Sequence, residues 1–189
     1  MTEPTPARAA RTARESQIIR VARDIAEAEG WAAVTVRRLA DAIGFSQPVL
    51  YGHFPDGREG IVRAVAIQGF TELAGALSGG RPNATARSRV QRVAKQYLAF
   101  ARGHPALYTA MFSMPIGLPF GASDAPSALR ESFAPILAAV GPDGDSESRA
   151  ELLWSTLHGL VELGNNRRLR ASHDRARLNL LIDQFAASR

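Results

Sequence analysis

The chain has 189 residues, of which 46% are hydrophobic and 22% are charged, so it is large enough and apolar enough to fold around a sizeable core. It contains no cysteine, which excludes disulfides and thiolate chemistry and restricts any metal site to histidine and carboxylate ligands. The net charge is +5, but Lys95 is the only lysine. Because nearly all of the positive charge is arginine, basicity alone is weak evidence for a nucleic-acid partner.

The N-terminal segment is basic and lacks the apolar core of a signal peptide. No later stretch approaches the run of about 18 apolar residues that a membrane-spanning helix needs. We therefore expect no membrane association and a cytoplasmic location. Residues 1–14 mix proline, threonine, alanine and arginine without periodicity, which predicts a flexible basic arm.

Three short helices are predicted between residues 15 and 63. The first begins near Glu15 and ends at Gly30, because its apolar residues recur at helical spacing up to that glycine. Thr35 is the expected N-cap of the second helix, which Gly44 closes. The third begins at Ser46, and the proline two residues later is compatible with a first helical turn.

The rest of the chain also predicts helices. The first of them runs from about residue 58 to residue 77, and the glycine-rich stretch at 78–83 is interpreted as a break between two regions. Further helices are expected at 84–103, 105–113, 126–140, 146–166 and 172–187. No segment alternates as a half-buried strand does. The predicted fold is all-α, with residues 64–189 as a second domain.

The second and third helices form a helix-turn-helix, in which the later helix enters the DNA major groove. Leu50 and Phe54, four residues apart, would anchor that helix on the core. Gln47 suits an adenine edge, Val49 suits a thymine methyl group, and hydroxyl or imidazole groups suit phosphates. The predicted DNA-binding residues are Thr35, Arg37, Ser46, Gln47, Pro48, Val49, Tyr51, Gly52, His53 and Arg58. The alternative is the polar surface of an unrelated helical protein.

Residues 15–65 resemble the DNA-binding domain of the TetR family of bacterial regulators. The likeness lies in "AEAEGWAAVTVRRLADAIGFSQPVLYGHF", residues 26–54. It implies a dimeric regulator, usually a repressor, that binds operator DNA and responds to a small-molecule effector. Two departures stand out. The turn "PDGRE" is one residue longer than usual, which leaves the phosphate contact of Arg58 open, and Gly52 replaces a bulkier residue.

The segment "LLWSTLHGLVEL", residues 152–163, resembles the Trp-x3-His-Gly subgroup of the family's effector domain. The resemblance implies that the last two helices pair with their copies in a homodimer. The predicted dimer-interface residues are Ser155, Gly159, Leu178, Leu181, Ile182 and Phe185. The alternative for each apolar position is the core of its own chain.

An effector pocket is predicted among the central helices. The apolar loop at 113–125 favours a pocket for a mostly apolar small molecule. His158 would be its polar anchor, although a structural histidine is an alternative, as ordinary core is for each aromatic residue. The predicted ligand-binding residues are Phe100, Tyr108, Met111, Phe112, Met114, Phe120, Trp154 and His158.

No catalytic residue, metal site or cofactor is predicted. The four histidines lack a metal-binding spacing, and no serine stands in a nucleophile elbow. The predicted function is a ligand-responsive transcriptional regulator that binds a palindromic operator as a dimer, and the resemblance implies repression as its mode of action. The alternatives are a helical small-molecule-binding protein or enzyme without specific DNA binding, and an architectural or RNA-binding protein.

Overall fold

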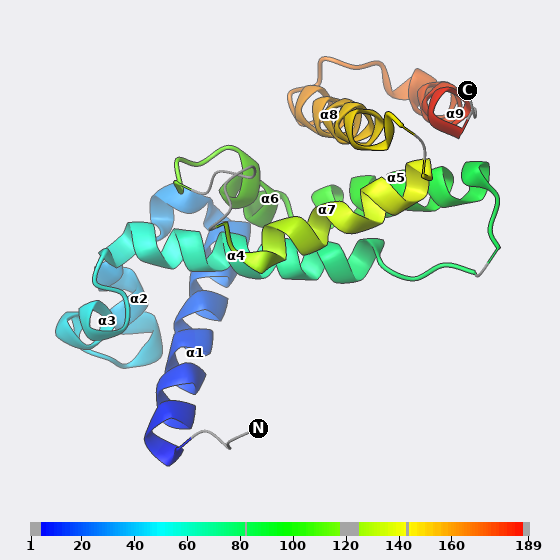
Figure 1. The fold of residues 1–189 in the computed structure, drawn as a ribbon. Helices are drawn as coiled ribbons and strands as arrows, with labels where there is room; N and C mark the ends of the chain where they lie inside the picture. The colour runs from blue at the N-terminus through cyan, green and yellow to red at the C-terminus, as the bar shows by residue number, and fades with distance from the viewer. Residues whose placement is uncertain (1–4, 82, 118–124, 143, 187–189) are drawn as a thin grey trace. The chain divides into compact units, whose positions relative to one another are not determined.

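The structure is a computed structural model that describes residues 5–81, 83–117, 125–142 and 144–186. Throughout these ranges the regular structure is helical and no strand occurs, as the sequence predicts (Figure 1). The elements in chain order are α1 (Pro6–Glu29), the 3-10 helix η1 (Trp31–Ala33), α2 (Val36–Ile43), α3 (Gln47–His53), α4 (Gly57–Leu77), α5 (Ala86–Gly103), α6 (Pro105–Phe112), α7 (Ser127–Val140), α8 (Ser146–Asn165), the 3-10 helix η2 (Ala171–His173) and α9 (Asp174–Ala186).

The chain divides into two compact units. The first comprises residues 1–69 with 104–119, and the second comprises residues 70–103 with 120–189. This division differs from the predicted boundary near residue 64, because α6 belongs to the same unit as α1–α3. The glycine-rich stretch at 78–83 is a connection inside the second unit rather than a domain border.

Helix α1 begins at Pro6, so the expected flexible arm is wrong for residues 6–14. Proline is favoured in a first helical turn, and alanine and arginine are good helix formers. Arg11 also donates from Nε to Glu15 Oε1 at 2.9 Å, one helical turn away. A second donor of Arg11 reaches the carbonyl oxygen of Gly52 at 3.1 Å, which ties this part of α1 to α3.

Local caps and one buried leucine set the positions of α2 and α3. Thr35 caps α2 by accepting a hydrogen bond from the backbone N–H of Arg38 at 3.2 Å. Gly44 ends α2 in the left-handed conformation, with φ of 70°, and α3 follows directly. Leu50 is 1% exposed and fixes which face of α3 is turned inward.

The glycine at the end of the turn after α3 has a conformational and a steric reason. Gly57 starts α4 with a φ of 56°, a conformation that other residues rarely adopt. A Cβ at this position would lie 3.0 Å from Cε1 of Tyr51. A glycine here therefore serves both the backbone and the Tyr51 ring that lies over it.

Polar contacts fasten α6 to α1 within the first unit. The carboxylate of Glu27 accepts hydrogen bonds from the backbone N–H groups of Ala106 and Leu107, both at 3.0 Å, and so caps α6. The indole N–H of Trp31 donates to the carbonyl oxygen of Ala106 at 2.7 Å. Gly69 allows α4 to approach α6 closely, because a Cβ there would meet the Met111 sulfur at 2.7 Å.

In the second unit, α5 packs against α7, α8 and α9, and α7 packs against α8. The core includes the buried side chains of α9: Leu181, Ile182 and Phe185. At 5%, 1% and 6% exposure these side chains have little surface left to bury in a partner. The structure therefore corrects the prediction that they form a dimer interface, because α5 covers them in their own chain.

Helix α4 is long and apolar enough to span a membrane by length and composition. The sequence expectation did not single it out, because charged residues interrupt its apolar run. Buried side chains recur along one side of the helix: Ile61, Val62, Val65, Ala66, Phe70, Leu73 and Leu77. This pattern is that of a core helix in a globular protein.

Candidate nucleic-acid interface and effector cavity

The outer face of α3 is a continuous polar and small-residue surface. Every predicted contact residue from Ser46 to Gly52 is exposed: Ser46, Gln47, Pro48, Val49, Tyr51 and Gly52. The aliphatic side chain of Val49 and the aromatic side chain of Tyr51 are 38% and 48% exposed. The burial of Leu50 on the opposite side is what turns this face outward.

Hydrogen-bonding groups on this face are unused. Among the residues that the structure describes, the side chains of Ser46, Gln47 and Tyr51 have no hydrogen-bond partner. Ser46 stands at the N-cap of α3, but its hydroxyl does not cap the helix. These three groups can therefore donate to or accept from an incoming ligand without first breaking an internal bond.

The start of α2 adds one available cation. Arg37 is exposed and has no partner in the described part of the chain. Its neighbour Arg38 is instead paired with Glu29 through both of its terminal nitrogens, one of them at 2.8 Å. A hydrogen bond from the Arg38 guanidinium lowers the pKa of the Glu29 carboxyl group below its ordinary value. Thr35, the cap of α2, is also exposed.

Two predicted DNA contacts are internal in the structure. The side chain of His53 is 8% exposed, and its Nδ1 lies 3.3 Å from Oε1 of Glu15. Arg58 donates to the carbonyl oxygens of Val34 and Trp31, both at 2.9 Å. These contacts correct both predictions: the imidazole bridges α3 to α1, and the guanidinium fastens the start of α4 to η1.

Gly52 has no packing reason to be a glycine. It lies in helical conformation, and a Cβ at this position would meet no atom within 4 Å. The protein itself therefore leaves this point of the outer face open. Gly52 therefore adds no side-chain bulk to the outer face of α3.

Comparison with known proteins decides what this face belongs to. Residues 18–65 match the family model described as bacterial regulatory proteins, tetR family, and residues 90–185 match the tetracyclin repressor-like C-terminal domain. The chain belongs to the TetR family. It is 34% identical over 164 residues to the uncharacterized HTH-type transcriptional regulator Rv0681 of Mycobacterium tuberculosis, which covers 83% of this chain and 72% of that protein.

Solved structures share the fold. A protein of unknown function from Rhodococcus sp. RHA1 has a TM-score of 0.71 at 24% identity, with 91% of this chain and 92% of that chain covered. A tetR-family transcriptional regulator from Streptomyces coelicolor has a TM-score of 0.67 at 23% identity, with coverage of 92% and 79%. BioQ, solved with its double-stranded DNA operator, has a TM-score of 0.64 at 20% identity, with coverage of 92% and 98%.

Family membership fixes the class of activity. Proteins of the TetR family are transcription factors with a helix-turn-helix DNA-binding domain, not enzymes, so the prediction of a non-enzymatic regulator is confirmed. Among the described residues no cluster of histidine, aspartate and glutamate could hold a metal ion. The more specific likeness to the Trp-x3-His-Gly subgroup stays a prediction.

The predicted effector residues fall into two groups that belong to different units. Tyr108, Met111, Phe112 and Met114 lie in the first unit, where the rings of Tyr108 and Phe112 are 4.6 Å apart. Met111 is 3% exposed and packs against Gly69 as core. Phe120 lies outside the described residues.

The second group consists of Phe100, Trp154 and His158. The indole N–H of Trp154 is 3.1 Å from the hydroxyl oxygen of Tyr97, and its ring meets Phe133 edge-on at 6.0 Å between centroids. Phe100 is 8% exposed, while Trp154 and His158 are partly exposed. Trp154 is thus held in place by two neighbours, as a structural residue would be.

A cavity of about 650 Å³ lies elsewhere in the second unit, among α5, α8 and α9. This volume is within the range of known small-molecule sites. None of the predicted effector residues within the described ranges lines it. The sequence prediction missed it because its walls come from leucines and arginines on three separate helices, and no local motif links them.

We predict different consequences for two substitutions on α3. Gln47→Ala should cost roughly 1–3 kcal/mol of discrimination at one base pair per half-site, because its exposed amide is free to read a base edge. Tyr51→Ala should weaken binding to specific and random duplexes together, because its exposed hydroxyl would donate to a phosphate. Competition binding against operator and scrambled DNA separates the two effects. Equal losses on all sequences for Gln47→Ala would contradict its base-reading role.

A second prediction separates Arg37 from Arg58. Arg37→Ala should reduce the slope of log affinity against log salt concentration by about 1 per subunit, because one phosphate contact is lost. Arg58→Ala should leave that slope unchanged and lower the free energy of unfolding by about 1–3 kcal/mol, since two carbonyl groups lose their donor. Salt titrations and urea denaturation give the two readouts. A smaller salt slope in Arg58→Ala would show that Arg58 binds phosphate after all.

Proposed function

We propose that this TetR-family regulator binds a palindromic operator as a homodimer, represses transcription, and is released by a small-molecule effector. The observation that carries the DNA-binding part is the outer face of α3, where the side chains of Ser46, Gln47 and Tyr51 have no hydrogen-bond partner among the described residues. The exposed Arg37 and Thr35 at the start of α2 would bind phosphate beside the groove. A cytoplasmic location follows from this function.

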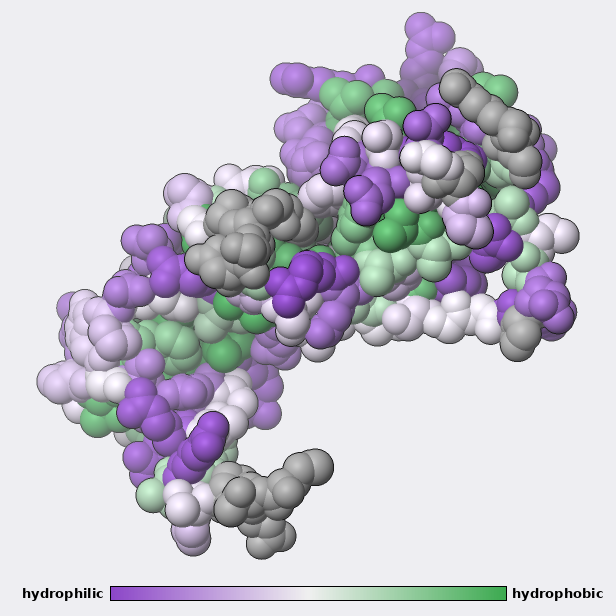
Figure 2. All heavy atoms as spheres, viewed as in Figure 1, coloured by the Kyte–Doolittle hydropathy of each residue, from purple (hydrophilic) through white to green (hydrophobic). Residues whose placement is uncertain are grey.

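The dimer would use the outer faces of α8 and α9. Leu152, Leu163 and Leu180 are 60%, 41% and 69% exposed in the single chain. On α8 the two leucines share one side with the small residues Ser155 and Gly159, which permit close helix approach. Figure 2 shows hydrophobic surface over α8 among hydrophilic neighbours. Such a face fits a second copy of itself across a two-fold axis.

An effector would release DNA by changing the distance between the two recognition helices of the dimer. In a dimer the two recognition helices meet successive major grooves about 34–36 Å apart, so a ligand that prefers another spacing weakens DNA binding by linkage. Helix α4 runs from the first unit into the second and is one covalent path for such a change. The connection from α5 to α6 is another, and Glu27 fastens α6 to α1.

The test of DNA recognition is selection of genomic fragments by the purified protein at physiological salt. We expect enriched fragments to share a palindrome whose half-sites are separated by about one helical turn or a multiple of it. A change in reporter expression upon deletion of the regulator then distinguishes repression from activation. Enrichment without any shared sequence would contradict an operator-binding role and favour an architectural protein.

For assembly, we predict that Leu180→Glu yields monomers and lowers operator affinity by roughly a hundredfold or more, because two half-sites no longer bind as one unit. Ala99→Glu places the same charge at an exposed position of α5 and should leave the dimer intact. Analytical ultracentrifugation and DNA titration give the two readouts. A Leu180→Glu protein that sediments as a dimer would exclude this face of α9 from the interface.

A further inference from the structure

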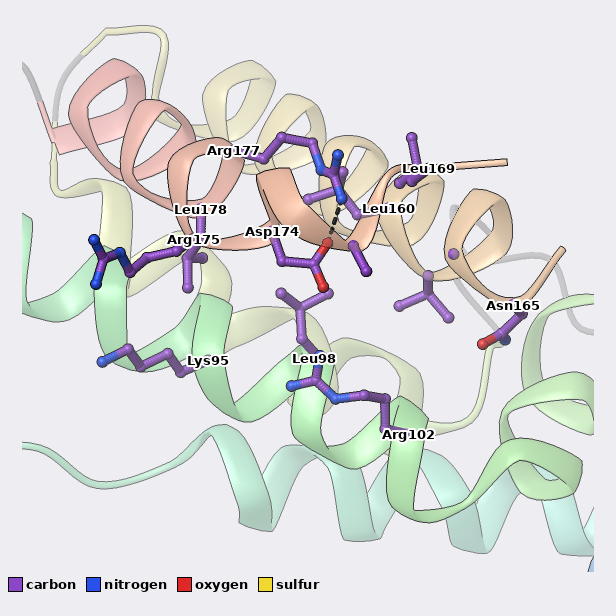
Figure 3. A pocket seen from close by; sticks show the side chains of 13 residues that line it. Lys95, Leu98, Arg102, Leu160, Asn165, Leu169, Asp174, Arg175, Arg177 and Leu178 are labelled. Carbon is purple, nitrogen blue, oxygen red and sulfur yellow. Dashed lines mark hydrogen bonds and ion pairs between the residues drawn. The ribbon is translucent and has the colours of Figure 1, made fainter. Parts of the chain in front are cut away.

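The cavity among α5, α8 and α9, here called the α5–α9 cavity, combines apolar walls with an excess of cations (Figure 3). Four of its lining side chains are cationic and one is a carboxylate. Its full lining is Lys95, Leu98, Arg102, Leu160, Val161, Gly164, Asn165, Leu169, Ala171, Asp174, Arg175, Arg177 and Leu178. All of these residues belong to the second unit.

Three of the four cations are uncompensated. The carboxylate of Asp174 pairs with Arg177. Within the described part of the chain, Lys95, Arg102 and Arg175 have neither an ion pair nor a hydrogen bond. Cations gathered around a low-dielectric wall create a positive potential that attracts an anion. The charge pattern of the cavity therefore favours a negatively charged occupant over a neutral one.

The lining also contains apolar side chains, which favour a ligand with an apolar part. Leu98 lies between Lys95 and Arg102 on α5, two cations that helical rise separates by about 10 Å. Leu160 of α8 and Leu178 of α9 face the same space. In Figure 3, Lys95 and Arg175 extend toward the same end of the cavity, while Arg102 lies beside Leu98 farther along it.

This cavity is separate from the proposed dimer face. Leu160, Val161 and Gly164 of α8 line the cavity, whereas Leu152 and Leu163 lie on another side of the helix and are exposed. An occupant would therefore contact residues that the proposed dimer does not use.

We propose that the α5–α9 cavity binds an amphipathic carboxylate, with its carboxylate at Lys95 and Arg175 and its alkyl chain against Leu98, Leu160 and Leu178. The cationic side chains attract the carboxylate head group. The leucines bind an alkyl chain by burying apolar surface, so small hydrophilic anions bind more weakly. Binding to this cavity can be tested with the free protein, without DNA. An influence of the bound ligand on operator release rests on the proposed function.

The test is calorimetric titration of the full-length protein with decanoate, decan-1-ol and acetate. We expect decanoate to bind roughly tenfold or more tightly than decan-1-ol, and acetate to give no measurable binding. Lys95→Met should weaken decanoate roughly three- to tenfold and leave decan-1-ol unchanged, as expected for one exposed ionic contact. Arg175→Met should act in the same way, which guards against a folding defect in one variant.

The matched control is Arg81→Met, which removes one exposed cation of the second unit that does not line the cavity and has no partner in the described ranges. Equal affinity for decanoate and decan-1-ol, or equal behaviour of Lys95→Met and Arg81→Met, would overturn the proposal. An assay of DNA release by decanoate separates the claim of ligand binding from the claim of an effector role. If the wild-type protein binds no decanoate but binds DNA sequence-specifically, the cavity site alone is refuted. If it binds decanoate but decanoate does not release DNA, the site is supported and its effector role is refuted.

Discussion

The hydrogen bonds around the turn at Trp31 hold the first unit together. The carbonyl oxygens of Trp31 and Val34 both accept from Arg58, and the indole N–H of Trp31 reaches Ala106. Glu27, one turn earlier, caps α6. Buried backbone groups must be paired, so this turn ties α1, α4 and α6 to one another. The position of α3, which packs on α2, depends on that arrangement.

The same requirement explains which polar residues are available for DNA. His53 and Arg58 each meet an internal partner, whereas the side chains on the outer face of α3 meet none in the described part of the chain. An uncommitted donor or acceptor on a rigid helix can bind a base or phosphate at little reorganisation cost. At the start of α4, Gly57 leaves room for the ring of Tyr51, and the adjacent Arg58 donates to the Trp31 carbonyl oxygen.

In the second unit, different apolar faces of α8 and α9 serve different purposes. Helix α9 carries buried leucine and phenylalanine side chains against α5 and one exposed leucine, Leu180, on another side. Helix α8 divides likewise between the core, the α5–α9 cavity and an exposed leucine face. One pair of helices can therefore complete its own core, border a cavity and still offer a surface to a second copy. An effector in the cavity would contact the same helices that we propose for the dimer.

The amino-acid sequence by itself determined the helices, the turn at Gly44 and the outward face of α3. These features are local, since apolar periodicity, caps such as Thr35 and the anchor Leu50 act within a few residues. The resemblance of residues 26–54 to the TetR family added the function. The extension of α1 to Pro6 is also local, but arginine and proline near a terminus fit an arm as well as a helix, so only the contact of Arg11 with Gly52 distinguishes them.

Tertiary structure alone decided the partners of residues that the sequence places on a face. Periodicity shows that Leu181 and Phe185 must be buried, but not whether α5 or a second chain buries them. A histidine or arginine near a DNA-binding helix likewise carries no local mark of an internal acceptor such as Glu15 or the Trp31 carbonyl oxygen. The α5–α9 cavity was invisible for the same reason. Its charges and leucines come from separate helices, and only long-range packing brings them around one space.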